Sequence, residues 1–153
     1  MKQKVKISDL IAPDRIVDLK CRTKNEVLRE MFRVIERSPE IRNGKAFEKS
    51  LIERENILTT GIGNEIAIPH VQTDVVDNMV IAIGRCEDGI DFDSLDGKPV
   101  KLVIMIASSN KQPRNEFLKV LAKVVMLFKD EAFRKQVLKA RKPEDVIKLL
   151  EPY

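Results

Sequence analysis

The sequence has a single histidine, His70, only two cysteines and no tryptophan. Structural metal sites need several Cys, His or carboxylate ligands, usually at short and regular spacings. Cys21 and Cys86 are far apart and show no such spacing. We therefore expect no metal centre and no cofactor, and we interpret the two cysteines as reduced thiols of a cytoplasmic protein.

Aromatic residues are also scarce, at 5% of the chain, whereas 43% of residues are hydrophobic and 34% are charged. These proportions are typical of a globular chain with an aliphatic core. A length of 153 residues suits one domain, covering residues 1–153. The net charge of +4 comes from 28 basic and 24 acidic residues that are closely interspersed. Without a basic face that carries stacking aromatics, nucleic acid is not an expected partner.

Long hydrophobic runs are missing as well. The basic start at residues 1–6 is not followed by an apolar segment. We therefore expect neither a signal peptide nor a direct membrane span.

Hydrophobic periodicity predicts strands that alternate with amphipathic helices. Apolar runs such as residues 79–83 are typical of strands covered on both faces. The pattern predicts one α/β domain, a mixed β-sheet flanked by helices on both faces. The expected elements are a strand at 15–19, helices at about 23–37 and 44–56, strands ending at 68 and at 79–83 and 102–107, and helices at 113–128, from 130 and from 143.

The most informative segment ends at the only histidine and reads Thr60-Gly61-Ile62-Gly63-Asn64-Glu65-Ile66-Ala67-Ile68-Pro69-His70. Its two glycines predict a turn, which a short apolar strand follows. The proline predicts that the chain leaves the strand at His70, because proline cannot donate to a sheet. Imidazole is the side chain best able to exchange protons, metals or phosphoryl groups near neutral pH.

The neighbours of His70 suit an anion. The amides of Gly61 and Gly63 can converge on an anion, Thr60 adds a hydroxyl, and Arg54 lies upstream. Together they favour a phosphoryl group carried on a ring nitrogen, because phosphoryl transfer needs alignment and charge stabilisation. Structural alternatives remain open: a histidine that bonds a nearby carbonyl, a solvated arginine, and glycines that only connect strands.

Arg54-Glu55 and the run from Thr60 to His70 closely resemble the enzyme IIA domain of the bacterial phosphotransferase system, in its fructose/mannitol/nitrogen-regulatory class. The stretch Gly89-Ile90-Asp91-Phe92-Asp93-Ser94-Leu95-Asp96-Gly97-Lys98-Pro99-Val100 looks like that family's loop and strand entry, and the resemblance spans about residues 7–150. It implies a mixed sheet flanked by helices and a phosphotransferase component. By resemblance, His70 accepts a phosphoryl group from the phosphocarrier HPr and passes it to a cysteine of an enzyme IIB, and Arg54 supports the phosphohistidine.

The chain departs from the family pattern where a second histidine often begins the motif His-Leu-x-x-Leu. The matching stretch here is Phe117-Leu118-Lys119-Val120-Leu121. Phenylalanine cannot donate a hydrogen bond to a phosphoryl oxygen. Phe117 is then either a ring that packs against the imidazole and excludes water, or only a core residue of its helix. The segment at 107–110 also lacks the proline that is usual there.

The resemblance implies two alternative functions. The first is a phosphoryl carrier for sugar uptake of the fructose or mannitol kind. The second is a nitrogen-type regulatory module that binds target proteins according to its phosphorylation state. A third reading, a domain without transfer activity, rests on Phe117.

Overall fold

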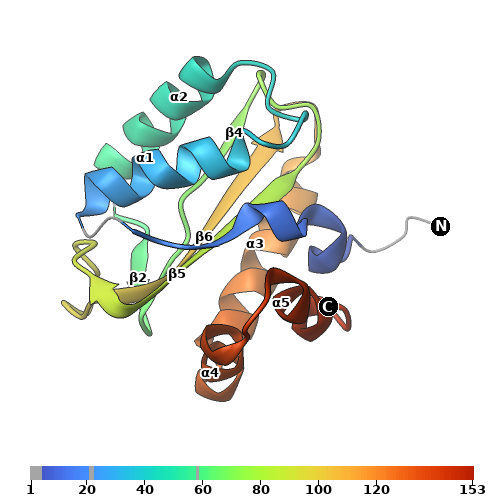
Figure 1. Ribbon diagram of the computed structural model, residues 1–153. Helices are drawn as coiled ribbons and strands as arrows, with labels where there is room; N and C mark the ends of the chain where they lie inside the picture. The colour runs from blue at the N-terminus through green and yellow to red at the C-terminus, as the bar shows by residue number, and fades with distance from the viewer. Residues whose placement is uncertain (1–4, 21–22, 58) are drawn as a thin grey trace.

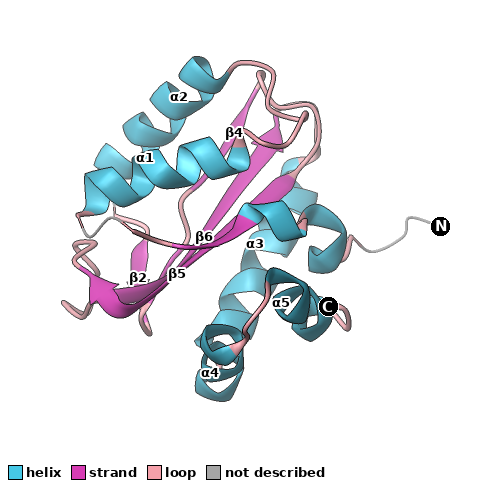
Figure 2. Ribbon diagram, viewed as in Figure 1, coloured by secondary structure: helices cyan, strands magenta, loops and turns pink. Residues whose placement is uncertain are grey.

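The computed structural model describes residues 5–20, 23–57 and 59–153, so Cys21 and residues 1–4 of the basic start lie outside the described residues. A mixed sheet, six-stranded within the described part, carries helices on both faces (Figures 1 and 2). The predicted α/β architecture is confirmed. The elements are two short 3-10 helices (Ile7–Leu10 and Pro13–Arg15), β1 (Ile16–Asp18), α1 (Lys24–Ile35), α2 (Gly44–Ile57), β2 (Gly61–Gly63), β3 (Ile66–Ala67), β4 (His70–Thr73), β5 (Val80–Ile90), β6 (Val100–Ser109), α3 (Arg114–Lys129), α4 (Glu131–Lys139) and α5 (Pro143–Leu150).

The helices lie where the hydrophobic periodicity predicts them, because their starts are encoded locally. The Thr23 hydroxyl accepts a hydrogen bond from the Glu26 amide at 3.2 Å at the start of α1. Asp130 accepts one from the Ala132 amide at 2.9 Å and so caps α4. Pro143 occupies the first turn of α5, where its missing amide hydrogen costs nothing. None of the described helices is long and apolar enough to cross a lipid bilayer.

The centre of the sheet is a long antiparallel pair, β5 and β6. Strand β1 pairs with β5 in parallel. On its other side β6 pairs with β3 and then, further along, with β4, both in parallel. Strand β4 has no second strand partner in the described part of the chain. The chain segment that begins with His70 therefore runs along an edge of the sheet.

The prediction of a turn at Gly61–Gly63 was wrong. These residues form β2, which pairs antiparallel with β3. The reversal lies at Asn64 and Glu65, whose φ angles are 55° and 65°. Two consecutive positive φ angles are the signature of the tight hairpin turn that matches strand twist. Asn64 tolerates this conformation well. The turn predicted from the glycines therefore exists, but it lies just after Gly63.

The strand before the proline, β3, ends at Ala67, but the chain does not leave the sheet at His70. His70 is the first residue of β4 and lies opposite Ile106 of β6. Pro69 cannot donate, but its carbonyl accepts a hydrogen bond from the Ile106 amide at 2.9 Å. The proline therefore interrupts the ladder for one donor only, and pairing resumes at once.

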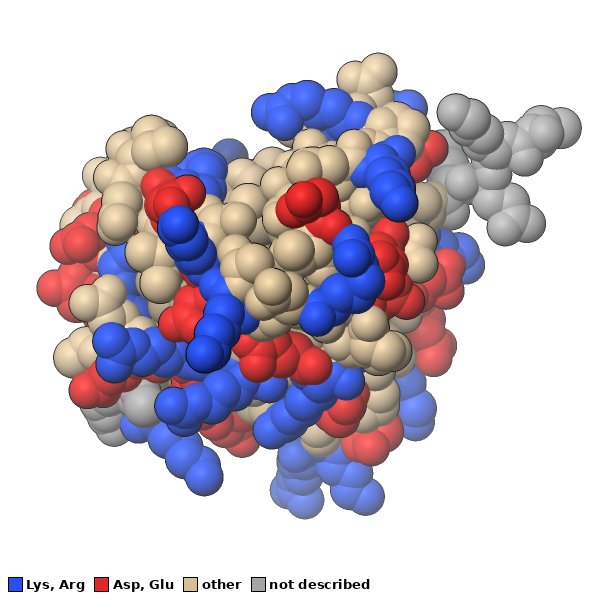
Figure 3. All heavy atoms as spheres, turned by 90° about the horizontal axis from the view of Figure 1, so that it is seen from above, with Lys and Arg blue, Asp and Glu red and all other residues tan. Residues whose placement is uncertain are grey.

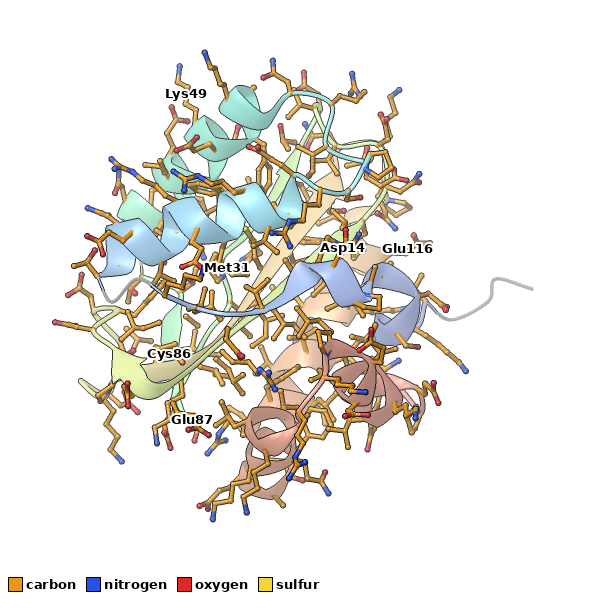
Figure 4. All side chains as sticks on the ribbon, in the orientation of Figure 1. Asp14, Met31, Lys49, Cys86, Glu87 and Glu116 are labelled. Carbon is orange, nitrogen blue, oxygen red and sulfur yellow. The ribbon has the colours of Figure 1, made fainter. Side chains whose placement is uncertain are left out.

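Two largely aliphatic cores lie on the two faces of the sheet, as the composition predicts. One is covered by α1 and α2, and Met31 lies between α1 and the sheet (Figure 4). The other is covered by α3, α4 and α5, and includes Ile66 and Ile68. Side chains alternate between faces along a strand, so His70, two residues after Ile68, faces α3. Cys86 is a free, buried thiol next to the α1 side.

Candidate functional site

The imidazole of His70 is half-buried, and one of its nitrogens is held by the backbone. Nδ1 lies 2.7 Å from the carbonyl oxygen of Ile68. A carbonyl oxygen only accepts hydrogen bonds, so Nδ1 must carry the proton of the neutral ring. The other nitrogen, Nε2, then keeps its lone pair. The backbone thereby selects the tautomer in which Nε2 is the unprotonated ring nitrogen.

The surroundings of His70 favour the neutral ring. Burial lowers the pKa of His70 below its ordinary value of 6.5, while the hydrogen bond to Ile68 raises it. The charges of Arg54 and Arg114 lower this pKa, and the carboxylate of Glu55 raises it, with a net lowering. A neutral imidazole at physiological pH is the form that can attack phosphorus.

We expect His70 to titrate with a midpoint below 6.5, its ordinary value. The chain has one histidine, so an NMR titration of ring signals reports this residue without overlap. Because the folded pKa is lowered, His70 contributes fully to stability above the unfolded pKa of about 6.5, and this contribution is lost as the pH falls toward the folded value. The chain in urea provides the unfolded reference. A folded midpoint at or above the urea value would contradict this environment.

Phe117, in the first turn of α3, forms one wall of the site. Its ring lies 5.9 Å from that of His70, centroid to centroid, at an angle of 47°. Only 3% of Phe117 is exposed, and it belongs to the core beneath α3. Phe117 is therefore a core residue that also packs against the imidazole. It removes water from one side of His70 and so contributes to the burial that lowers its pKa.

Arg54 lies in the last turn of α2 and comes from the opposite side of the site. The structure brings it near enough to His70 for its positive charge to lower the pKa of the imidazole. A cation in a last helical turn is also favoured by the helix dipole. Its side chain is half-buried, so its field is less screened than that of a fully exposed arginine.

The other predicted anion ligands are engaged elsewhere. Thr60 is buried, and its amide and hydroxyl both donate to the Glu55 carboxylate. The Gly61 amide donates to the Thr59 hydroxyl at 3.1 Å. Gly63 lies at the far end of β2, where an added Cβ would meet Asp96 at 3.3 Å. The amides that were expected to converge on an anion thus lie in or beside a paired strand, and those of Thr60 and Gly61 already have side-chain acceptors.

Two residues near His70 were missed by the sequence analysis. Gln72 follows two positions along β4 and therefore shares a face with His70. Arg114 begins α3, donates to Gln72 Oε1 at 3.3 Å, and lowers the pKa of His70. The strand alternation would have indicated Gln72 if β4 had been recognised. Arg114 lies one helical turn before Phe117, which is a weaker signal.

A groove of about 620 Å³ opens between α1 and the start of α2 and is lined by charged side chains such as Arg29, Arg33 and Lys45. It lies at the opposite end of α2 from Arg54. Acidic and basic side chains also alternate over the face shown in Figure 3. His70 itself lies in an edge strand of the sheet. This position suits a reaction with a group carried by another protein.

An α/β fold with one fixed imidazole beside arginine charges defines a candidate histidine phosphocarrier. Residues 10–153 match the family model described as "Phosphoenolpyruvate-dependent sugar phosphotransferase system, EIIA 2". The chain therefore belongs to this family of enzyme IIA phosphoryl carriers and is a phosphotransferase component.

Two curated relatives carry different names. A "PTS system fructose-specific EIIABC component" of Bacillus subtilis (strain 168) is 35% identical over 147 residues, which is 95% of this chain but 23% of the relative. The chain thus spans less than a quarter of that protein. A "Nitrogen regulatory protein" of Bradyrhizobium diazoefficiens is 30% identical over 147 residues, and the match covers 94% of both chains.

Solved structures agree with the fold. The nitrogen regulatory protein IIA-Ntr of Neisseria meningitidis superposes with a TM-score of 0.86 at 27% identity, covering 94% of this chain and 98% of that one. IIA mannitol of Escherichia coli superposes with a TM-score of 0.77 at 22% identity, covering 91% and 97%. The second comparison shows the shared fold alone.

Proposed function

We propose that this protein accepts a phosphoryl group from phosphorylated HPr on Nε2 of His70 and passes it to a cysteine of an enzyme IIB. The observation that carries the proposal is the 2.7 Å contact between His70 Nδ1 and the Ile68 carbonyl. It leaves Nε2 as the nucleophile, and the lowered pKa of His70 keeps the ring neutral.

In the transfer step the Nε2 lone pair forms a bond to phosphorus. The N–P bond of the donor phosphohistidine breaks, and its electron pair returns to the donor nitrogen. The proton on Nδ1 stays on the ring and remains shared with Ile68. Arg54 and Arg114 bring positive charge toward the phosphoryl oxygens, where charge stabilisation supplies most of the catalysis.

For the role of the carrier, sugar uptake of the fructose or mannitol kind is the first proposal. It is supported by the 35% identity to the fructose-specific Bacillus subtilis protein. A regulatory role is the alternative, supported by the TM-score of 0.86 with IIA-Ntr of Neisseria meningitidis. Phosphorylation adds about −1.5 to −2 charges at the ring, which lets protein targets distinguish the two states.

The test is incubation with phosphoenolpyruvate, enzyme I and HPr, followed by addition of a fructose-type enzyme IIB. We expect one acid-labile phosphoryl group per chain, which then moves to the IIB cysteine. Absence of label on this chain under these conditions would sink the transfer proposal. Label that forms but does not move to IIB would favour the regulatory alternative.

The Phe117→His variant is expected to accept the phosphoryl group about tenfold faster, because an imidazole can donate a charge-assisted hydrogen bond to a phosphoryl oxygen. The variant should also be less stable by about 1–3 kcal/mol, because a polar ring replaces a buried apolar one. A quenched time course of phosphorylation measures the rate, and thermal unfolding measures the stability. Phe117→Leu keeps an apolar side chain without a donor and should show no rate gain. A slower Phe117→His variant would show that the phenyl ring itself serves the site.

A further inference from the structure

Glu55 is a buried carboxylate next to Arg54 on α2, with 6% of its surface exposed. Its Oε1 and Oε2 accept hydrogen bonds from the Thr60 amide at 3.0 and 2.9 Å. The Thr60 hydroxyl donates to Oε1 at 2.6 Å. Lys24 Nζ lies 3.6 Å from Oε1 and supplies the opposite charge. A buried carboxylate is costly unless it is held in this way, so its position is strongly determined.

A continuous path of hydrogen bonds leads from Glu55 to the imidazole. The Thr60 carbonyl accepts from the Ile68 amide at 2.9 Å. The Ile68 carbonyl accepts from His70 Nδ1 at 2.7 Å. Each contact has the length of a well-formed hydrogen bond. Through Thr60 and Ile68, the buried carboxylate is therefore linked to the carbonyl that accepts the Nδ1 proton.

We propose that Glu55 is a positioning residue for phosphoryl transfer at His70, acting through Thr60 and Ile68 on the carbonyl that holds Nδ1–H. The inference rests on the proposed function of His70 as the phosphoryl acceptor. Transfer requires Nε2 to point along the line of attack, and a small misplacement of a nucleophile lowers the rate up to about 100-fold. Glu55 also raises the pKa of His70, so its charge favours the positive ring that forms when Nε2 bonds phosphorus.

The first test is the Glu55→Gln variant. An amide cannot accept both Thr60 donors without turning its own donor toward one of them. We expect the ring-nitrogen NMR signals of the single histidine to shift toward a mixture of the two tautomers. Phosphorylation by phospho-HPr should slow by about 10- to 100-fold. Glu53→Gln, which changes an exposed carboxylate on the same helix, is the matched control and should change neither measurement.

A milder pair of variants tests the same path if Glu55→Gln does not fold. Thr60→Val removes the hydroxyl donor at nearly constant volume, and we expect smaller changes in the same direction. Thr60→Ser keeps the hydroxyl, so its ring-nitrogen spectrum and its phosphorylation rate should be close to those of the unmodified protein. A purely structural role would instead follow side-chain volume.

Folded Glu55→Gln or Thr60→Val protein with unchanged ring signals and an unchanged rate would overturn the positioning role. The ring spectra need no phosphoryl donor, so they separate this inference from the proposed function. If the unmodified chain accepts no phosphoryl group, the proposed function fails. A tautomer shift in Glu55→Gln would still support control of the imidazole by Glu55, and its absence would refute it.

Discussion

Replacing His70 by alanine is expected to abolish phosphorylation by phosphoenolpyruvate, enzyme I and HPr, with no acid-labile label left on the chain. His70 is the only histidine, so no second imidazole can accept the group. No other side chain is poised in the same way, with one ring nitrogen held by Ile68 at 2.7 Å and the other free to attack. Label is measured by phosphate incorporation before and after acid treatment.

Loss of label must be separated from loss of fold. His70 is half-buried at the start of an edge strand, so its truncation should cost only about 1 kcal/mol of unfolding free energy. The variant should therefore keep the circular dichroism and amide NMR spectra of the folded chain. The control is Lys49→Ala, which truncates an exposed side chain on α2. This variant should be phosphorylated normally. Acid-labile label that persists in the His70→Ala variant would place the phosphoryl group on another residue.

The helices could be predicted from sequence because their signals are local. Thr23 and Asp130 cap helices through neighbouring amides, and hydrophobic spacing marks their buried faces. Strand β2 was missed because it is only three residues long. Strand β4 was missed because its partner, β6, is distant in sequence. Strand β4 has the polar composition that is typical of an edge strand. It forms through backbone pairing with β6.

The candidate site could be predicted only in part. His70 and Arg54 were identified from the residues themselves and Phe117 from the motif resemblance, and the structure brings them together. The contacts of Glu55 and Arg114 with the site depend on how α2, β2 and α3 meet in three dimensions. No hydrophobic periodicity records such polar contacts between separate elements. The prediction of converging glycine amides failed because both glycines lie in β2, paired with β3, and the Gly61 amide donates to the Thr59 hydroxyl.

Arg54→Ala is expected to slow phosphoryl transfer by about tenfold to 100-fold while leaving the fold intact. The expected loss is a charge-assisted contact with a phosphoryl oxygen, worth about 1.5–3 kcal/mol. The pKa of His70 should rise in this variant, because the charge of Arg54 is one cause of its lowering. Rapid-quench phosphorylation and the NMR titration of the single histidine report the two effects separately.

The comparison of Arg54→Lys with Arg54→Ala shows what kind of contact is lost. Lysine keeps the charge but not the planar donor pair, so it should restore the pKa of His70 more fully than the transfer rate. Lys49→Ala removes a cation from the same helix, away from the site, and controls for net charge. Transfer kinetics that are unchanged in Arg54→Ala would count against a contact with the phosphoryl group. A rate restored completely by lysine would instead assign Arg54 a role through charge alone.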